Sequence, residues 1–368
     1  MATLASARIR SVDLVRTTAI AIMVVVHFVE NLSGVVPKIS GFGAPLFTLL
    51  SGLSYRLWLD GQLARGASDA LIRVRTIRRG LFLIGAGILF NVLVWMPQDV
   101  FNWDVLTFIG FGYLMLEWAR RMSLLVCTWA CAVLLAISPA ARVAVDYASF
   151  WTAGYFEHDA TLSDVLSGLL VSGYFPLLPW LCYPLLGFLV ASVLFSHDRT
   201  SRREISWCAK LGALLLAASL TALALESLWP ALLEGLGGRW LGGWTNYPAT
   251  PEFVSGTLGI ALLFFAAAYR WLDSPDAQAW PRLELWIGRY SRHAFTLYVL
   301  HHIVHLWPLW WLAAARGEET TQYWQRALSP WPALALAVVF LALTAPLLAW
   351  MERRRVRGVE DWMRWICD

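Results

Sequence analysis

Apolar runs long enough to cross a lipid bilayer recur along almost the whole of this 368-residue chain. A helix needs about 20 mostly apolar residues to span the hydrocarbon core, where backbone polar groups must pair within the protein. Charged residues make up only 15% of the chain, against about 25% in an average soluble domain. The pattern excludes a soluble globular enzyme and predicts an all-α integral membrane protein.

We predict about ten membrane spans in a single helical bundle. The first run lacks a small-residue cleavage site after its apolar part, so we interpret it as a retained helix and not as a signal peptide. The apolar patch at 162–173 is too short to span, and we expect it to lie in the interface or to re-enter the membrane. The predicted spans cover residues 12–31, 42–59, 77–96, 104–119, 123–138, 175–196, 206–228, 254–272, 290–313 and 331–351.

The distribution of positive charge predicts the orientation of these spans. With the N-terminus in the cytoplasm, all 29 lysines and arginines fall on the inner side except Lys38, Arg142, Arg239, Arg316 and Arg326. Cytoplasmic loops of membrane proteins carry such an excess of Lys and Arg. We therefore expect both termini in the cytoplasm, as in a bacterial inner-membrane protein. Residues 1–351 form the predicted transmembrane domain, and residues 352–368 a basic amphipathic cytoplasmic tail.

The five cysteines form no metal or redox motif. Cys127 and Cys131 share a helix face, but no histidine or carboxylate lies near them in the sequence to complete a metal site. We interpret the cysteines as packing residues and predict no bound metal. The expected partners are the lipid bilayer and small molecules but no nucleic acid, and a homodimer is an open alternative.

A polar stripe runs along the first predicted span. Arg16 and His27 lie eleven residues apart, which in a helix is about 1100°, or roughly three full turns and 16 Å of rise. Asp13 and Glu30 fall on the same side. One interpretation is that Arg16 and Asp13 snorkel at the interface while His27 merely ends the span. We favour a functional interpretation, because ionisable residues at membrane depth usually face a cavity or a partner.

Arginines also gather in the loop SDALIRVRTIRRG before the third span. They can anchor the topology, which requires no further function. The alternative is a site for a polyanionic cytosolic ligand, because arginine forks bind phosphate through two parallel hydrogen bonds. The arginines in question are Arg73, Arg75, Arg78 and Arg79.

Five further residues are candidates with a structural alternative each. Asn91 is polar at membrane depth, and Trp180 follows two prolines in FPLLPW, where a broken helix can line a cavity. His301 lies within a span beside His302, and we expect that both rings cannot point the same way, since adjacent helical residues diverge by about 100°. Asn91, Trp180 and His301 are assigned to substrate binding, with aromatic packing as the alternative for Trp180 and a structural histidine as the alternative for His301. Arg289 and Arg292 either contact phosphate or anchor their helix.

Several segments together resemble a known family. They are RIRSVDLVRTTAIAIMVVVHF, GAPLFTLLSGLSYRL, RRGLFLIGAGILF, DVLTFIGFGYLML, FPLLPWLCYPLLGFLVA and IGRYSRHAFTLYVLHHIV. In order and spacing they resemble the catalytic domain of heparan-alpha-glucosaminide N-acetyltransferase and its bacterial relatives. Arg16-x10-His27 and Arg75-x-x-Arg78 are also similar to two motifs of the related acyltransferase-3 family. The resemblance covers essentially the whole chain and implies that residues 1–351 are a transmembrane acyltransferase domain.

The resemblance implies acyl transfer from cytoplasmic acyl-CoA, usually acetyl-CoA, to a sugar presented across the membrane. Carried over by position, His27 is the expected catalytic residue, and Arg16, Arg75 and Arg78 hold the CoA. The lysosomal enzyme has asparagine at the position of His27 and a histidine where this chain has Lys38. The role of His27 therefore rests on the acyltransferase-3 pattern, and heparan itself is not implied as the acceptor.

Our hypothesis is an integral-membrane acyltransferase that uses acetyl-CoA or another acyl-CoA and modifies a hydroxyl or amine of a sugar-like acceptor. His27 would act as general base or as nucleophile, and Glu30 would fix its tautomer. The residues do not choose between these two routes or between O- and N-acylation. The alternative is a transporter of a small anion or lipid-linked sugar, but we find no internal repeat of the kind many transporters show.

Overall fold

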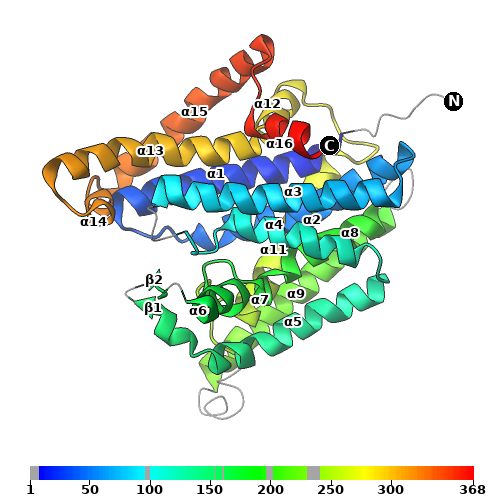
Figure 1. Ribbon diagram of the computed structural model, residues 1–368. Coiled ribbons are helices and arrows are strands. Elements are labelled where there is room, and N and C mark those ends of the chain that lie inside the picture. Colours follow the sequence, from blue (N-terminus) through cyan, green and yellow to red (C-terminus); the bar gives the residue numbers. More distant parts are fainter. Residues whose placement is uncertain (1–7, 96–99, 153, 160, 196–201, 230–240) are drawn as a thin grey trace. The chain divides into compact units, whose positions relative to one another are not determined.

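The computed structural model describes the chain except for residues 1–7, 96–99, 153, 160, 196–201 and 230–240 (Figure 1). Helices make up nearly all of its regular structure. The one sheet among the described residues has two short antiparallel strands, β1 (Trp151–Thr152) and β2 (Tyr155–Phe156), with Trp151 opposite Phe156. The predicted all-α class is confirmed.

Seven helical segments of the described chain are long and apolar enough to cross a membrane. The chain is thus a membrane protein, and within the described residues each predicted apolar run overlaps a helix or a pair of helices. Residues 96 and 196, the last positions of two predicted runs, lie outside the described residues. The apolar helix α4 (Val105–Ala119) is shorter, whereas α2 (Ser40–Ala64) and α13 (Ala294–Arg316) are long but carry more polar side chains. The seven are α1 (Arg10–Ser33), α3 with η1 (Asp69–Trp95), α5 (Leu124–Ala144), Leu162–Leu194, α9 (Arg202–Leu228), α11 (Pro251–Leu272) and α15 (Pro330–Arg354).

Three boundaries differ from the sequence-based prediction. The run at 290–313 is not continuous, because α12 (Pro281–Arg292) ends at His293, where φ and ψ of −105° and 27° leave the helical region before α13 begins. The run at 175–196 is broken at Leu178, which separates the short α7 (Leu177–Trp180) from α8 (Cys182–Leu194). At the other end, α15 continues through Arg354, so the predicted boundary at residue 351 falls inside a helix.

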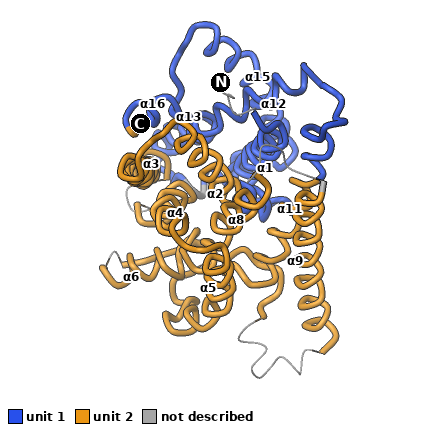
Figure 2. Tube along the Cα trace, turned by 90° about the vertical axis from the view of Figure 1, so that its right-hand side faces the viewer, with its two compact units in different colours: residues 1–47, 267–366, 368 blue, residues 48–266, 367 orange. Residues whose placement is uncertain are grey.

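The helices form two compact units, which Figure 2 shows in different colours. Unit 1 comprises residues 1–47, 267–366 and 368, and unit 2 comprises residues 48–266 and 367. Helix α2 contributes its first turns to unit 1 and the rest to unit 2.

In unit 1, α1 is the central helix. It packs against α12, α13, α14 (Thr320–Gln325) and α15, and Figure 1 shows α13 running alongside it. The hydroxyl of Thr17 donates to the carbonyl of Ile287 at 2.9 Å, which ties α1 to α12. The amphipathic helix α16 (Val359–Cys367) follows α15, and the carboxylate of Glu360 accepts hydrogen bonds from the backbone and the hydroxyl of Thr296. These hydrogen bonds hold α12 against α1 and α16 against α13.

Unit 2 depends on close helix packing at glycines. A Cβ atom on Gly80 of α3 would lie 2.9 Å from the carbonyl oxygen of Gly110 of α4, and one on Gly110 would lie 2.6 Å from that of Gly80. Small residues allow helix backbones to approach in this way within membranes. The same unit contains α5, η3 (Tyr147–Phe150), α6 (Leu162–Ser167), η4 (Gly168–Ser172), α7, α8 and α9. The short apolar patch predicted at 162–173 corresponds to two of these helices, α6 and η4.

Candidate active site

Three histidines from two helices of unit 1 meet in one cluster. The ring of His27, on α1, lies 5.2 Å from that of His301 and 4.6 Å from that of His302, both on α13. His27 and His301 are stacked with an interplanar angle of 13°, and Nδ1 of His27 is 2.9 Å from Nε2 of His301. Although His301 and His302 are adjacent in the helix, both rings contact the ring of His27.

Backbone carbonyls determine which nitrogens carry protons in the neutral rings. Nδ1 of His301 lies 3.0 Å from the carbonyl oxygen of Leu297, and a carbonyl can only accept, so this nitrogen is the donor. Nε2 of His301 then has the unshared pair and accepts from Nδ1 of His27. It follows that the neutral ring of His27 has its proton on Nδ1 and an unshared electron pair on Nε2.

The free pair on His27 is the main chemical feature of the cluster. His27 is partly exposed, whereas His301 and His302 are buried. In the part of the chain that the structure describes, no side chain or backbone group forms a hydrogen bond with Nε2 of His27. A nitrogen with this environment can accept a proton or attack an electrophilic carbon.

A fourth histidine and an asparagine extend the cluster. Nδ1 of His305 donates to the carbonyl of His301 at 2.5 Å, and the amide of Asn31 donates to Nε2 of His305 at 2.9 Å. His305 and Asn31 were not singled out from the sequence, and His302 was considered only beside His301 and was not assigned to the site. The spacing of His301 and His305, one helical turn apart, is a signal that points to a shared face. Glu30 does not occupy the position expected of it, because His301 is the hydrogen-bond partner of His27 Nδ1.

Arg16, at the other end of the polar stripe, has partners within unit 1. Its Nη1 donates to the hydroxyl of Ser291 at 2.6 Å and lies 4.0 Å from the carboxylate of Asp13. Asp13 also binds the guanidinium of Arg8. The side chain of Arg16 is therefore held between α1 and α12, and it is 23% exposed.

Arg289 and Arg292 both pair with Glu352 of α15. Nε of Arg289 lies 2.9 Å from one carboxylate oxygen and Nη2 of Arg292 lies 2.6 Å from the other. In this structure the two arginines fasten α12 to α15, which is the arrangement that the anchor interpretation predicts.

In unit 2 the arginines of the predicted cytosolic loop differ strongly in exposure. Arg73 and Arg78 are exposed, and Arg75 is partly exposed and donates to the amide oxygen of Gln62 at 2.7 Å. Arg79 is only 7% exposed, and its guanidinium lies 4.5 Å from the ring centre of Trp58. Arg79 is therefore a buried stacking residue and not part of an exposed basic surface.

Asn91 and Trp180 occupy two separate environments of unit 2. Asn91 is fully buried at the start of the π-helix η1 and donates to the carbonyl of Val100 at 3.2 Å. Trp180 follows the predicted helix break and is also fully buried. Its Nε1–H has no hydrogen-bond partner among the described residues.

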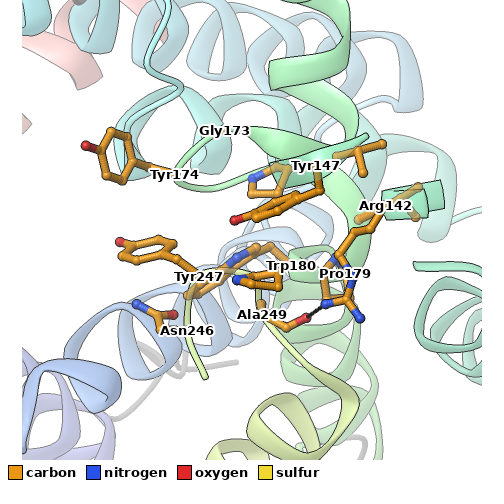
Figure 3. Close-up of a pocket in the computed structure, with 13 residues that line it drawn as sticks. Arg142, Tyr147, Gly173, Tyr174, Pro179, Trp180, Asn246, Tyr247 and Ala249 are labelled. Carbon is orange, nitrogen blue, oxygen red and sulfur yellow. Dashed lines mark hydrogen bonds between the residues drawn. The ribbon is translucent and has the colours of Figure 1, made fainter. Parts of the chain in front are cut away.

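Trp180 lines a pocket with a mostly aromatic and proline wall, which Figure 3 shows. The guanidinium of Arg142 borders this pocket and donates to the carbonyl of Ala249 at 3.2 Å. The buried Oδ1 of Asn246 lacks a partner among the described residues. The lining residues are Arg142, Tyr147, Val171, Gly173, Tyr174, Pro176, Leu178, Pro179, Trp180, Asn246, Tyr247, Pro248 and Ala249.

Comparison with known proteins identifies one family. The family model described as heparan-alpha-glucosaminide N-acetyltransferase, catalytic, matches residues 8–228. The matched region contains Arg16, His27, Arg75, Arg78, Asn91 and Trp180, whereas the histidines of α13 lie beyond it. A search of curated proteins finds no match.

Proposed function

We propose a reaction for this chain from one premise, which is that it belongs to the heparan-alpha-glucosaminide N-acetyltransferase catalytic family. The family and the apolar helices indicate a membrane acetyltransferase-type protein. Our specific proposal is an integral-membrane acyltransferase that moves an acyl group, in particular acetyl, from cytoplasmic acyl-CoA to a hydroxyl or amine of a sugar-like acceptor.

The observation that carries this proposal is the tautomer of His27. Its Nε2 has an unshared pair, and its Nδ1–H is directed at His301. As a general base, Nε2 would take the proton of the acceptor group while the acceptor oxygen or nitrogen bonds to the thioester carbon. The carbon–sulfur bond breaks, and the proton passes to the departing CoA thiolate. General base catalysis of this kind contributes roughly 10²–10⁴-fold.

A nucleophilic route would use the same nitrogen. Nε2 would bond to the thioester carbon and CoA would leave as thiolate. The acceptor oxygen or nitrogen would then bond to the acyl carbon, the carbon–Nε2 bond would break, and the acceptor proton would pass to the CoA thiolate. In both routes the ring of His27 gains positive charge while Nδ1–H remains bonded to His301. We therefore revise the role of His301 from substrate contact to positioning residue, because it holds the tautomer that both routes require.

For the acyl-CoA donor we propose contacts with Arg16, Arg75 and Arg78. Arginine binds phosphate through charge-assisted hydrogen bonds, and Arg78 has an exposed side chain. Arg79 is less suited because it already stacks on Trp58, and Arg289 and Arg292 are less suited because they already pair with Glu352.

For the acceptor we propose contact with Trp180, whose pocket offers aromatic rings together with unpaired polar atoms. Asn91 is better suited to a structural role, since its amide is bonded to Val100.

We also propose ten spans with both termini in the cytoplasm of a bacterial inner membrane. The support is the predicted charge asymmetry across the loops, together with α2, α4 and α13, which are helical in addition to the seven apolar segments.

The deciding experiment uses the purified protein in detergent with acetyl-CoA labelled in the acetyl group. We expect the wild-type protein to bind acetyl-CoA and to catalyse transfer to a sugar acceptor, or slow thioester hydrolysis without one. His27→Ala should retain acetyl-CoA binding and lose transfer by roughly 10²–10⁴-fold, because only a transition-state interaction is removed. Full activity in that variant would refute the assignment. Absence of acetyl-CoA binding, with uptake of an anion by proteoliposomes, would establish the transporter alternative.

A further inference from the structure

Ring nitrogens of His27, His301 and His302 lie close together, and among the described residues no carboxylate belongs to this group. One ligand nitrogen from each of His27, His301 and His302 lies within 4.8 Å of the other two. Nδ1 of His302 lies 3.2 Å from the carbonyl of Tyr298, just as Nδ1 of His301 bonds to that of Leu297. Both rings of α13 are therefore held with Nε2 as the nitrogen that bears an unshared pair. A cation that replaced the Nδ1 proton of His27 would face imidazole nitrogens of all three rings.

We propose that His27, His301 and His302 form a binding site for a divalent transition-metal ion, with Zn²⁺ as the expected occupant. Imidazole nitrogen is a preferred ligand of Zn²⁺, Cu²⁺ and Ni²⁺, and three histidines with one open position are an established zinc ligand set. The prediction of no metal considered the cysteines, whereas His27 and His301 are 274 residues apart in the sequence.

The surroundings of the two α13 histidines resemble those of metal-bound histidine. Metal-ligating imidazoles almost always donate their second ring N–H to a carbonyl or carboxylate, which fixes the tautomer and the ring orientation. His301 and His302 make this contact with backbone carbonyls of their own helix. Zinc–nitrogen distances of about 2.0–2.1 Å place two ligands of a tetrahedral site roughly 3.4 Å apart. Nδ1 of His27 and Nε2 of His301 are 2.9 Å apart, and the three ligand nitrogens lie within 4.8 Å of one another, so the observed distances bracket that spacing.

Metal binding would inhibit the proposed acyl transfer, and this part of the inference rests on the proposed function. The nitrogen of His27 that faces His301 is Nδ1. An ion bound there replaces the Nδ1 proton, so the neutral ring must carry its proton on Nε2. The electron pair that would accept a proton or attack the thioester is then lost. Zn²⁺ binding and catalysis are thus mutually exclusive states of His27.

The direct test is a titration of the metal-free full-length protein in detergent with Co²⁺, followed by displacement with Zn²⁺. We expect visible d–d absorption from one Co²⁺ per chain and loss of the bands on addition of Zn²⁺. His302→Phe keeps an aromatic ring but removes a ligand nitrogen, so it should weaken Co²⁺ binding at least tenfold. His305→Phe is the matched control on the same helix, because the ligand set does not include His305, and its Co²⁺ spectrum should match the wild type.

The outcomes separate the metal site from the proposed reaction. Absence of d–d bands in the wild type at millimolar Co²⁺, or equal Co²⁺ affinity in wild type and His302→Phe, overturns the metal site whatever the activity. If Co²⁺ binds as expected, the activity with Zn²⁺ divided by the activity without it is compared among variants. Inhibition of the wild type that is relieved in His302→Phe supports the exclusion of catalysis by metal. Inhibition that is equal in both variants overturns it.

Discussion

The hydrogen bond between His27 and His301 gives a partly exposed imidazole a single neutral tautomer. In water the two tautomers of a free imidazole exchange, and a base is effective only in the one whose electron pair faces the proton. Here the backbone carbonyl of Leu297 fixes His301, and His301 fixes His27. Metal sites and hydrolase triads use the same arrangement, in which a third group orients the reacting ring.

Replacement of His301 should expose this positioning role. His301→Phe removes the acceptor for His27 Nδ1–H, and a hydrogen bond to a group that becomes charged contributes about 1.5–3 kcal/mol, or roughly 10–150-fold in rate. We expect kcat to fall by that factor while the Kd for acetyl-CoA stays constant. His301→Gln can still present an acceptor oxygen and should recover part of the loss. Equal activity of the Phe and Gln variants would contradict a role through the tautomer.

Arg75 and Arg78, the two arginines of the Arg-x-x-Arg motif, should contribute to the binding of the acyl-CoA donor. In the double variant Arg75→Ala and Arg78→Ala we expect weaker acetyl-CoA binding, measured by calorimetry, by several kcal/mol at most, since each charged hydrogen bond contributes roughly 1.5–3 kcal/mol. The matched control is Arg121→Ala, because Arg121 is 44% exposed and pairs with Asp69 and Glu117. The control should bind as the wild type does. An unchanged Kd in the double variant would leave the motif as a topology anchor.

At the scale of elements, the sequence predicts the helices well and their interruptions poorly. A long apolar run specifies a spanning helix because backbone groups in lipid must pair internally. The predicted span ran through Leu178, although the neighbouring prolines allow a broken helix there, whereas no glycine or proline marks the break at His293. Three residues before this break, the Tyr290 hydroxyl of α12 donates to the carbonyl of Leu341 on α15. Contacts between distant segments decide such positions.

Glycines of α3 provide a test of packing between elements. A Cβ atom at Gly87 would lie 2.8 Å from the backbone nitrogen of Thr107 on α4, whereas one at Gly85 would have no atom within 4 Å. Overpacking of a close contact costs typically 1–3 kcal/mol, so Gly87→Ala should lower the thermal unfolding midpoint. Gly85→Ala should leave it unchanged or raise it, because alanine favours the helix by about 1 kcal/mol over glycine. Equal midpoints for the two variants would argue against tight packing of α3 on α4.

At the scale of the whole molecule, the sequence points to single residues of the candidate site but not to the way in which they come together. The polar stripe of Arg16 and His27 follows from helical periodicity within one run. The meeting of His27 with His301 and His302 depends on the packing of α1 against α13, which no local pattern encodes. The family match ends at residue 228, so it gives no help with α13. A cluster of this kind becomes visible only when the two helices are placed together.

Orientation in the membrane is the last property that the sequence predicts, and two exposed positions test it. Ala70 lies at the start of α3 in the arginine-rich segment expected inside, and Glu157 lies after β2 in a segment expected outside. In intact bacteria, a membrane-impermeant maleimide should label Glu157→Cys and should label Ala70→Cys only after permeabilisation. The native cysteines provide a low background, since four of the five are buried and Cys131 is partly buried. Labelling of Ala70→Cys in intact cells would show that this segment lies outside, which is the opposite of the predicted topology. Acyl-CoA in the cytoplasm would then have no access to Arg75 and Arg78, so this labelling pattern also decides whether those arginines can bind the donor.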